Sequence, residues 1–140
     1  MNTKPETNPT PKATPAKSWE SRLLELCQLE DGWLDGEGLA MNAETRDSAW
    51  EICKSVEKDG YPRPGIYPTP EGGIQLEWLL GEPHGARGII VFRLEPDLSY
   101  DLHRVTFADK SYDEIVTPFM CAAFAKLNEW FKEFEDAKSP

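Results

Sequence analysis

Apolar side chains recur at helical spacing in three stretches of the chain. Ser18 can cap a first helix over about residues 18–29, and Asn42 can cap a second one that ends before Gly60. Thr117-Pro118, an N-cap followed by proline at the first helical position, predicts a third helix to about residue 135. The three apolar stripes are Trp19, Leu23, Leu24, Leu26 and Cys27, then Ala49, Trp50, Ile52, Cys53 and Val56, and last Phe119, Ala123, Leu127, Trp130 or Phe131, and Phe134.

Between the second and third helices the pattern changes to period two, which is typical of half-buried strands. The predicted strands cover residues 66–67, 74–80, 89–94 and 98–107. Connections this short require antiparallel neighbours, so the strands form a meander. Residues 113–116 are interpreted as a turn that precedes the last helix. The predicted fold class is α+β: a two-layer, three- to four-stranded antiparallel meander covered by helices, in the order α-α-β-β-β-β-α.

The chain divides into two parts. Residues 1–17 contain four prolines and no large apolar side chain apart from the initial methionine, which predicts a disordered tail. Residues 18–140 are predicted to form a single α+β domain. The aromatic end of the last helix has two interpretations, packing on the sheet or binding a partner.

The formal net charge is −10, with 25 acidic and 15 basic residues. Residues 1–17 hold three lysines and one glutamate, so the remainder carries −12. Such a domain repels nucleic-acid phosphates, and we expect no direct nucleic-acid binding but a protein partner with a basic surface. Simple solubility is the plainer explanation of the charge. The chain shows no apolar membrane-length run, no secretory signal and three widely spaced cysteines, so we expect a cytoplasmic protein that does not contact a membrane.

Asp31 to Gly38 is an acidic, glycine-rich stretch around Trp33. Its carboxylates suggest a calcium loop, but the ligand order is wrong for an EF-hand, so we expect no metal. Two other interpretations stay open. Trp33 fills the core while the carboxylates cap backbone amides, or the loop is exposed and recognises a partner.

Motifs for catalysis are absent from the sequence. His84 and His103 have no cysteine or histidine at ligand spacing, so zinc is not expected. Gly72-Gly73 precedes a strand and not the helix that a phosphate loop needs. Glu71 and Glu77 could act as paired carboxylates, but strand alternation places Glu77 opposite Trp78, toward solvent. We therefore expect no enzyme and no cofactor.

Two motifs together resemble those of a known group. Residues 32–38 read G-W-L-D-G-E-G, and residues 68–78 read P-T-P-E-G-G-I-Q-L-E-W. The pair resembles a loose group of small uncharacterised bacterial and phage-borne proteins with G-W-x-D-G-x-G followed by P-x-P-x-G-G-I-x-L-E-W. This resemblance covers about residues 20–105 and implies an antitoxin, immunity, anti-defence or other inhibitory role.

The sequence is thus interpreted as an acidic protein-binding module that inhibits or regulates a partner protein. The candidate partner-binding residues are Trp33, Asp35, Glu37, Glu71 and Glu77. Two alternatives stay open: a DNA-mimic inhibitor of a nucleic-acid-binding protein, and a small-molecule-binding protein or enzyme that uses the Asp/Glu cluster. The sequence leaves the oligomeric state undetermined.

Overall fold

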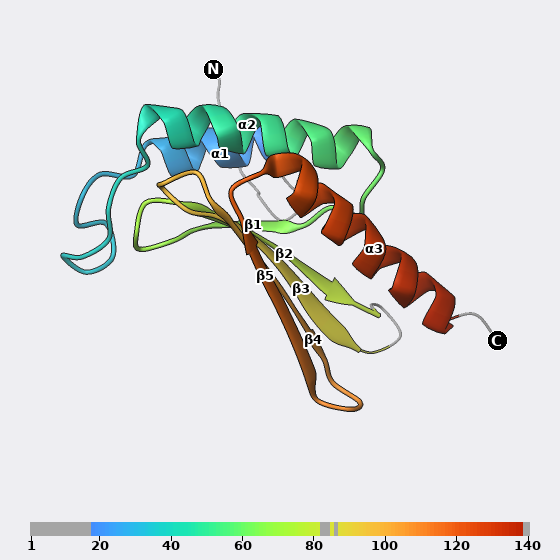
Figure 1. The fold of residues 1–140 in the computed structure, drawn as a ribbon. Coiled ribbons are helices and arrows are strands. Elements are labelled where there is room, and N and C mark those ends of the chain that lie inside the picture. The colour runs from blue at the N-terminus through green and yellow to red at the C-terminus, as the bar shows by residue number, and fades with distance from the viewer. Residues whose placement is uncertain (1–17, 82–84, 86, 139–140) are drawn as a thin grey trace, which may run out of the picture.

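The computed structural model describes residues 18–81, 85 and 87–138, so the predicted tail at residues 1–17 lies outside the described residues. The elements follow the order α-α-β-β-β-β-β-α (Figure 1). Their bounds are α1 Trp19–Cys27, α2 Ala43–Lys58, β1 Gly65–Pro68, β2 Ile74–Leu80, β3 Gly88–Leu94, β4 Tyr100–Thr106, β5 Ser111–Thr117 and α3 Met120–Lys138.

The predicted starts of the first two helices are confirmed by their caps. The Ser18 hydroxyl accepts a hydrogen bond from the backbone N–H of Ser21, and the Asn42 side chain accepts one from Thr45. These side chains satisfy amides that have no partner inside the first turn. Helix α2 ends at Lys58, just before Gly60, which adopts a positive φ.

The strands form one antiparallel meander in the order β1-β2-β3-β4-β5, so the predicted count of three to four strands is wrong. The error lies at residues 113–116, which belong to strand β5 and not to a turn before the last helix. All seven residues of β5 pair with β4, from Ser111 opposite Thr106 to Thr117 opposite Tyr100. This ladder satisfies the backbone groups of the segment that face β4, without helical hydrogen bonds. The predicted start of the third helix at Thr117-Pro118 is also wrong, because Thr117 is the last residue of β5 and α3 begins at Met120. Thr117 accepts a hydrogen bond from the Phe119 N–H just before the helix.

All three helices lie on one face of the sheet (Figure 1). Alternate residues of β2, β3 and β4 point toward them and form the core with the apolar stripes of the helices. Helix α3 lies against β4 and β5, and Trp130 near its end is only 3% exposed. Phe131 and Phe134 also pack against the core. Of the two interpretations of this aromatic helix end, the structure supports packing on the sheet.

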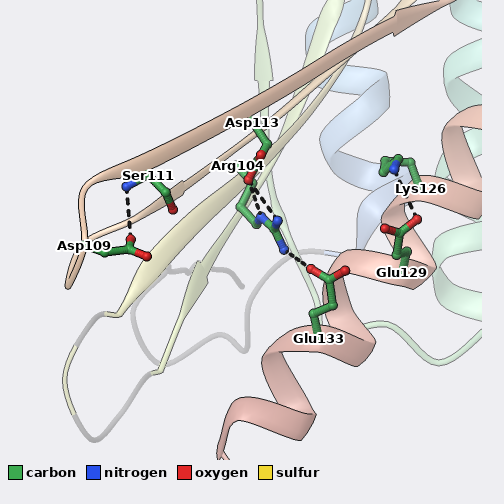
Figure 2. Close-up of polar contacts among 7 residues, drawn as sticks. All are labelled: Arg104, Asp109, Ser111, Asp113, Lys126, Glu129 and Glu133. Atoms are coloured by element: carbon green, nitrogen blue, oxygen red, sulfur yellow. Dashed lines mark hydrogen bonds and ion pairs between the residues drawn. The ribbon is translucent and has the colours of Figure 1, made fainter.

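Arg104 joins the two layers (Figure 2). It points from β4 toward the helices and contacts Asp113 of β5 through Nε and Nη2, at 3.2 and 2.8 Å from Oδ2. Its Nη1 donates to Glu133 of α3 at 2.6 Å, and its guanidinium lies 5.0 Å from the ring centroid of Trp130. The planar guanidinium can make these contacts at the same time, so Arg104 fixes α3 on the sheet.

The two edges of the sheet differ. Arg22 of α1 donates to the carbonyl oxygen of Ile66, which covers part of the β1 edge. No described element pairs with the outer edge of β5. In the described part of the chain no helix covers the face opposite α1, α2 and α3 (Figure 1), which we call the open face. Within β2 to β5, by strand alternation and register, its residues are Gln75, Glu77, Leu79, Ile89, Val91, Arg93, Asp101, His103, Val105, Tyr112, Glu114 and Val116.

Candidate functional site

The loop around Trp33 folds as a small hairpin. Leu34 and Glu37 exchange two backbone hydrogen bonds, and the Gly32 N–H donates to the Gly38 carbonyl. Asp35 and Gly36 between them have φ values of 51° and 93°. Two central residues with positive φ define a type I′ turn, for which Asp-Gly is a favoured pair. The turn holds the side chains of Asp35 and Glu37 out in solvent.

Trp33 is half-buried and lies outside the main core. Its indole N–H donates to the carbonyl oxygen of Leu39 at 3.1 Å. The ring packs so closely over Gly38 that a Cβ there would lie 2.9 Å from it. Trp33 therefore stabilises its own loop. It neither fills the main core nor is fully exposed, so the structure lies between the two interpretations of this loop.

This loop lies beside the turn that contains Glu71. The Leu39 N–H donates to the carbonyl oxygen of Pro70 at 2.8 Å, and the Ala40 N–H donates to Asp31 Oδ1. The two sequence motifs are thus neighbours in space. Their contact brings exposed Glu71 to the same end of the sheet as the Trp33 loop, as the candidate site requires.

Glu77 lies apart from that loop, in the middle of β2 on the open face. The predicted alternation is confirmed, since neighbouring Trp78 is 3% exposed on the helix side. Across the sheet Glu77 is in register with Val91, His103 and Glu114. Of the five candidate residues, Glu77 is the one within the open face.

The structure brings together a cluster that the sequence prediction missed. Asp101 and His103 are alternate residues of β4, and Glu114 of the adjacent strand β5 pairs directly with His103. Each offers one metal-ligand atom, and these atoms all lie within 4.8 Å of one another. The alternation of Asp101 and His103 was a usable signal. Nothing in the sequence placed Glu114 beside them, because its segment was expected to be a turn.

Burial and charge alter the ionisation of this cluster. Desolvation raises the pKa of Asp101 to about 6, and the adjacent carboxylate of Glu114 adds to the increase. Desolvation lowers the pKa of His103, with a further decrease from the positive charge of Arg93. Arg93 donates two hydrogen bonds to Gln75 Oε1, at 2.8 and 3.2 Å. Such shifted groups are more frequent at functional sites than elsewhere.

Further carboxylates connect this cluster to the end of the sheet where the Trp33 loop and Glu71 lie. Glu95 lies between them: its negative charge raises the pKa of Asp101. Burial raises the pKa of Glu95 itself, and Glu71 and Asp97 raise it further. Carboxylates therefore extend from the Glu71 turn onto the open face, and like charges so close favour a cation or a basic group beside them.

Apolar side chains surround this polar centre. Leu79, Tyr112 and Val116 are 48%, 57% and 65% exposed, respectively. Val91, at the centre of the face, is only 4% exposed because its neighbours cover it. Exposed apolar side chains grouped with charged ones on one surface are characteristic of protein-interaction sites.

Two cavities lie elsewhere in the described residues. One of about 590 Å³ lies between α1, α2 and β1, next to Trp19 and Tyr61. The other, of about 560 Å³, lies between the end of α3 and strands β3 to β5, next to Arg104 and Phe107. Neither is lined by any of the five candidate residues, so they do not support the small-molecule alternative at the Asp/Glu cluster.

Compared with protein-family models, with curated protein sequences and with solved structures, the chain matches none of them. The resemblance to bacterial and phage-borne proteins therefore stays a prediction. Within the part of the chain that the structure describes, none of the helices has the length and apolar character that a membrane span requires.

Proposed function

We propose that this protein binds another protein that has a basic surface, and that it inhibits or regulates that partner. The binding surface is the open face together with the acidic sheet end formed by the Trp33 loop and the Glu71 turn. The observation that carries the proposal is the composition of the open face. Exposed Leu79, Tyr112 and Val116 surround carboxylates on a sheet face that no described helix covers.

The two components of this surface have different roles. The carboxylates attract a basic partner over a distance and orient it, because opposite charges accelerate the encounter of two proteins. The apolar side chains then provide most of the affinity once water is excluded around them. Tyr112 is well suited as an anchor, since an aromatic ring buries a large area at a low cost in conformational entropy.

A DNA mimic would place its carboxylates in a continuous array with the spacing of phosphates. On the open face, the carboxylates of Glu77 and Glu114 instead alternate with apolar residues such as Val91, and Arg93 adds a positive charge. A surface that is partly apolar and partly acidic fits a folded protein partner better than it imitates a nucleic acid.

The test begins with capture of partners from lysate on the immobilised full chain, and it depends on a matched pair of variants. Leu79→Ala changes the open face, whereas Leu24→Ala changes an exposed leucine on α1. The captured protein is then purified, and its Kd for each variant is measured by calorimetry. We expect Leu79→Ala to weaken binding by about tenfold, as is typical of an interface residue worth about 1.4 kcal/mol, and Leu24→Ala to have no effect. Equal Kd values for the two variants would refute the proposed surface.

A further inference from the structure

We infer that Asp101, His103 and Glu114 form a binding site for one divalent transition-metal ion at the centre of the open face. The three side chains come from the adjacent strands β4 and β5. They provide one imidazole and two carboxylates, a donor set that suits Zn²⁺ and its first-row neighbours. The site does not depend on the proposed protein partner.

The spacing of the three side chains fits a single ion. Ligand atoms about 2.0–2.2 Å from a metal lie about 3–4.4 Å from one another, depending on the angle between them. The ligand atoms of this cluster all lie within 4.8 Å of each other. Their separations therefore exceed the upper end of this range by at most about 0.4 Å.

A second observation, independent of the spacing, also indicates a ligand. Asp101 Oδ1 and His103 Nδ1 are both inaccessible to solvent, and neither has a hydrogen-bond partner in the described part of the chain when Asp101 and Glu114 are both ionised. Leaving a buried polar atom without a partner is costly, so such atoms are rare in folded proteins. Two of them in one three-residue cluster are accounted for if a metal ion binds there.

The surroundings are consistent with a cation. Arg93 is the positive side chain whose charge acts on Asp101 and His103, but its described hydrogen bonds both go to Gln75. Glu77 lies in the same cross-strand row as His103 and Glu114 and adds negative charge. The imidazole ligand favours a transition metal over Ca²⁺ or Mg²⁺, which prefer oxygen donors throughout.

The experiment titrates the untagged full chain with Zn²⁺ by calorimetry and with Co²⁺ by visible absorption. We expect saturation at one ion per chain, with a Co²⁺ spectrum that changes on binding. The chain has two histidines, which provide a matched comparison of His103→Gln with His84→Gln. Glu114→Gln and Glu51→Gln form the corresponding pair of carboxylates, since Glu51 is exposed on α2 and lies away from the site.

Loss of an outer-shell partner alone weakens metal binding by about 10–100-fold, so His103→Gln and Glu114→Gln should each weaken it at least as much. His84→Gln and Glu51→Gln should leave one ion bound with a nearly unchanged Kd. Circular dichroism checks that each variant is folded, and Asp101→Asn takes the place of any variant that is not. Absence of saturable binding, or equal binding by the two histidine variants, would overturn the inference.

Discussion

The backbone N–H of Leu39 donates a hydrogen bond to the carbonyl oxygen of Pro70, with 2.8 Å between nitrogen and oxygen. This bond joins the end of the Trp33 loop to the turn before β2. Gly72 extends the same contact, since a Cβ at that position would lie 3.0 Å from the carbonyl oxygen of Ala40. The two glycine-rich motifs are therefore parts of one structural unit, and a substitution in the turn should also alter the conformation of the loop.

The first prediction concerns Gly73→Ala in that turn. A Cβ on Gly73 would lie 2.1 Å from the carbonyl oxygen of Leu94, a backbone atom that cannot rotate away. The Gly73 N–H also donates to the Thr69 hydroxyl at 2.9 Å, so the turn is fixed on both sides. We expect the substitution to lower the free energy of unfolding by about 3 kcal/mol, measured by urea denaturation.

Gly36→Ala is the matched control for this prediction. Gly36 has a φ of 93°, but no atom would lie within 4 Å of its added Cβ. It should therefore cost only the strain of a left-handed conformation, about 1–2 kcal/mol. If Gly73→Ala costs no more than Gly36→Ala, the close approach to Leu94 does not determine the geometry of the turn.

The second prediction concerns Arg104→Met, which removes the charged contacts between the layers. The variant retains an apolar chain over Trp130 but leaves Asp113 and Glu133 without their partner. The side chain of Arg104 is 20% exposed, so these pairs are partly shielded from solvent. We expect a loss of about 1–3 kcal/mol in the free energy of unfolding, less than for a fully buried pair.

A more exposed ion pair provides the comparison for Arg104. Lys126 and Glu129 are one helical turn apart on α3, at 3.1 Å. Lys126→Met should change stability by less than about 0.5 kcal/mol, as expected for a surface pair. A double-mutant cycle of Arg104→Met with Glu133→Gln should give a coupling free energy, and additive effects would show that the pair does not hold α3 on the sheet.

The fold was largely predictable because local chemistry determines most of it. Ser18 and Asn42 cap their helices as expected, and the alternation around Trp78 places the correct face of β2 inward. Strand β5 was missed because Thr117-Pro118 is a strong helix start. That signal led to the interpretation of residues 113–116 as a turn before the helix, although pairing with β4 determines their structure.

The candidate sites differ for the same reason. The Trp33 loop could be recognised as a turn from the sequence because the residues that form the turn, Asp35 and Gly36, are adjacent in the chain. The cluster of Asp101, His103 and Glu114 could not be recognised in this way, because His103 and Glu114 are brought together only by strand pairing. That pairing involves β5, the strand that was not predicted from the sequence. Sites assembled by a sheet register become visible only when every strand is known.

The third prediction concerns the order in which the three cysteines react with a thiol reagent. Cys53 is 2% exposed, and desolvation, assisted by the charge of Glu20, raises its pKa to about 12. Burial also raises the pKa of half-buried Cys27, whereas Cys121 is exposed at the start of α3. At pH 8 a thiol with a pKa of about 12 is ionised in about one molecule in ten thousand. Iodoacetamide should therefore modify Cys121 first, Cys27 more slowly and Cys53 only after unfolding.

Peptide mass spectrometry at successive times measures this order. Because burial and not sequence causes the difference, all three cysteines should react at similar rates in concentrated urea. Cys121→Ser should remove the fast phase and leave the slow ones unchanged. Rapid modification of Cys53 in the native protein would show that α2 is not packed as the structure describes.

The last prediction concerns the acidic sheet end once a partner is purified. Glu37→Lys and Glu71→Lys reverse exposed charges beside the Leu39–Pro70 contact, and Glu51→Lys makes the same charge change on the exposed side of α2. If the sheet end attracts the partner, the first two variants should lower the association rate constant severalfold at low salt and reduce its dependence on salt concentration. Glu51→Lys should have a smaller effect, since it changes the total charge equally but lies away from the proposed surface. Stopped-flow measurements at several salt concentrations compare the three, and identical rate constants would show that net charge alone, and not this surface, governs the encounter.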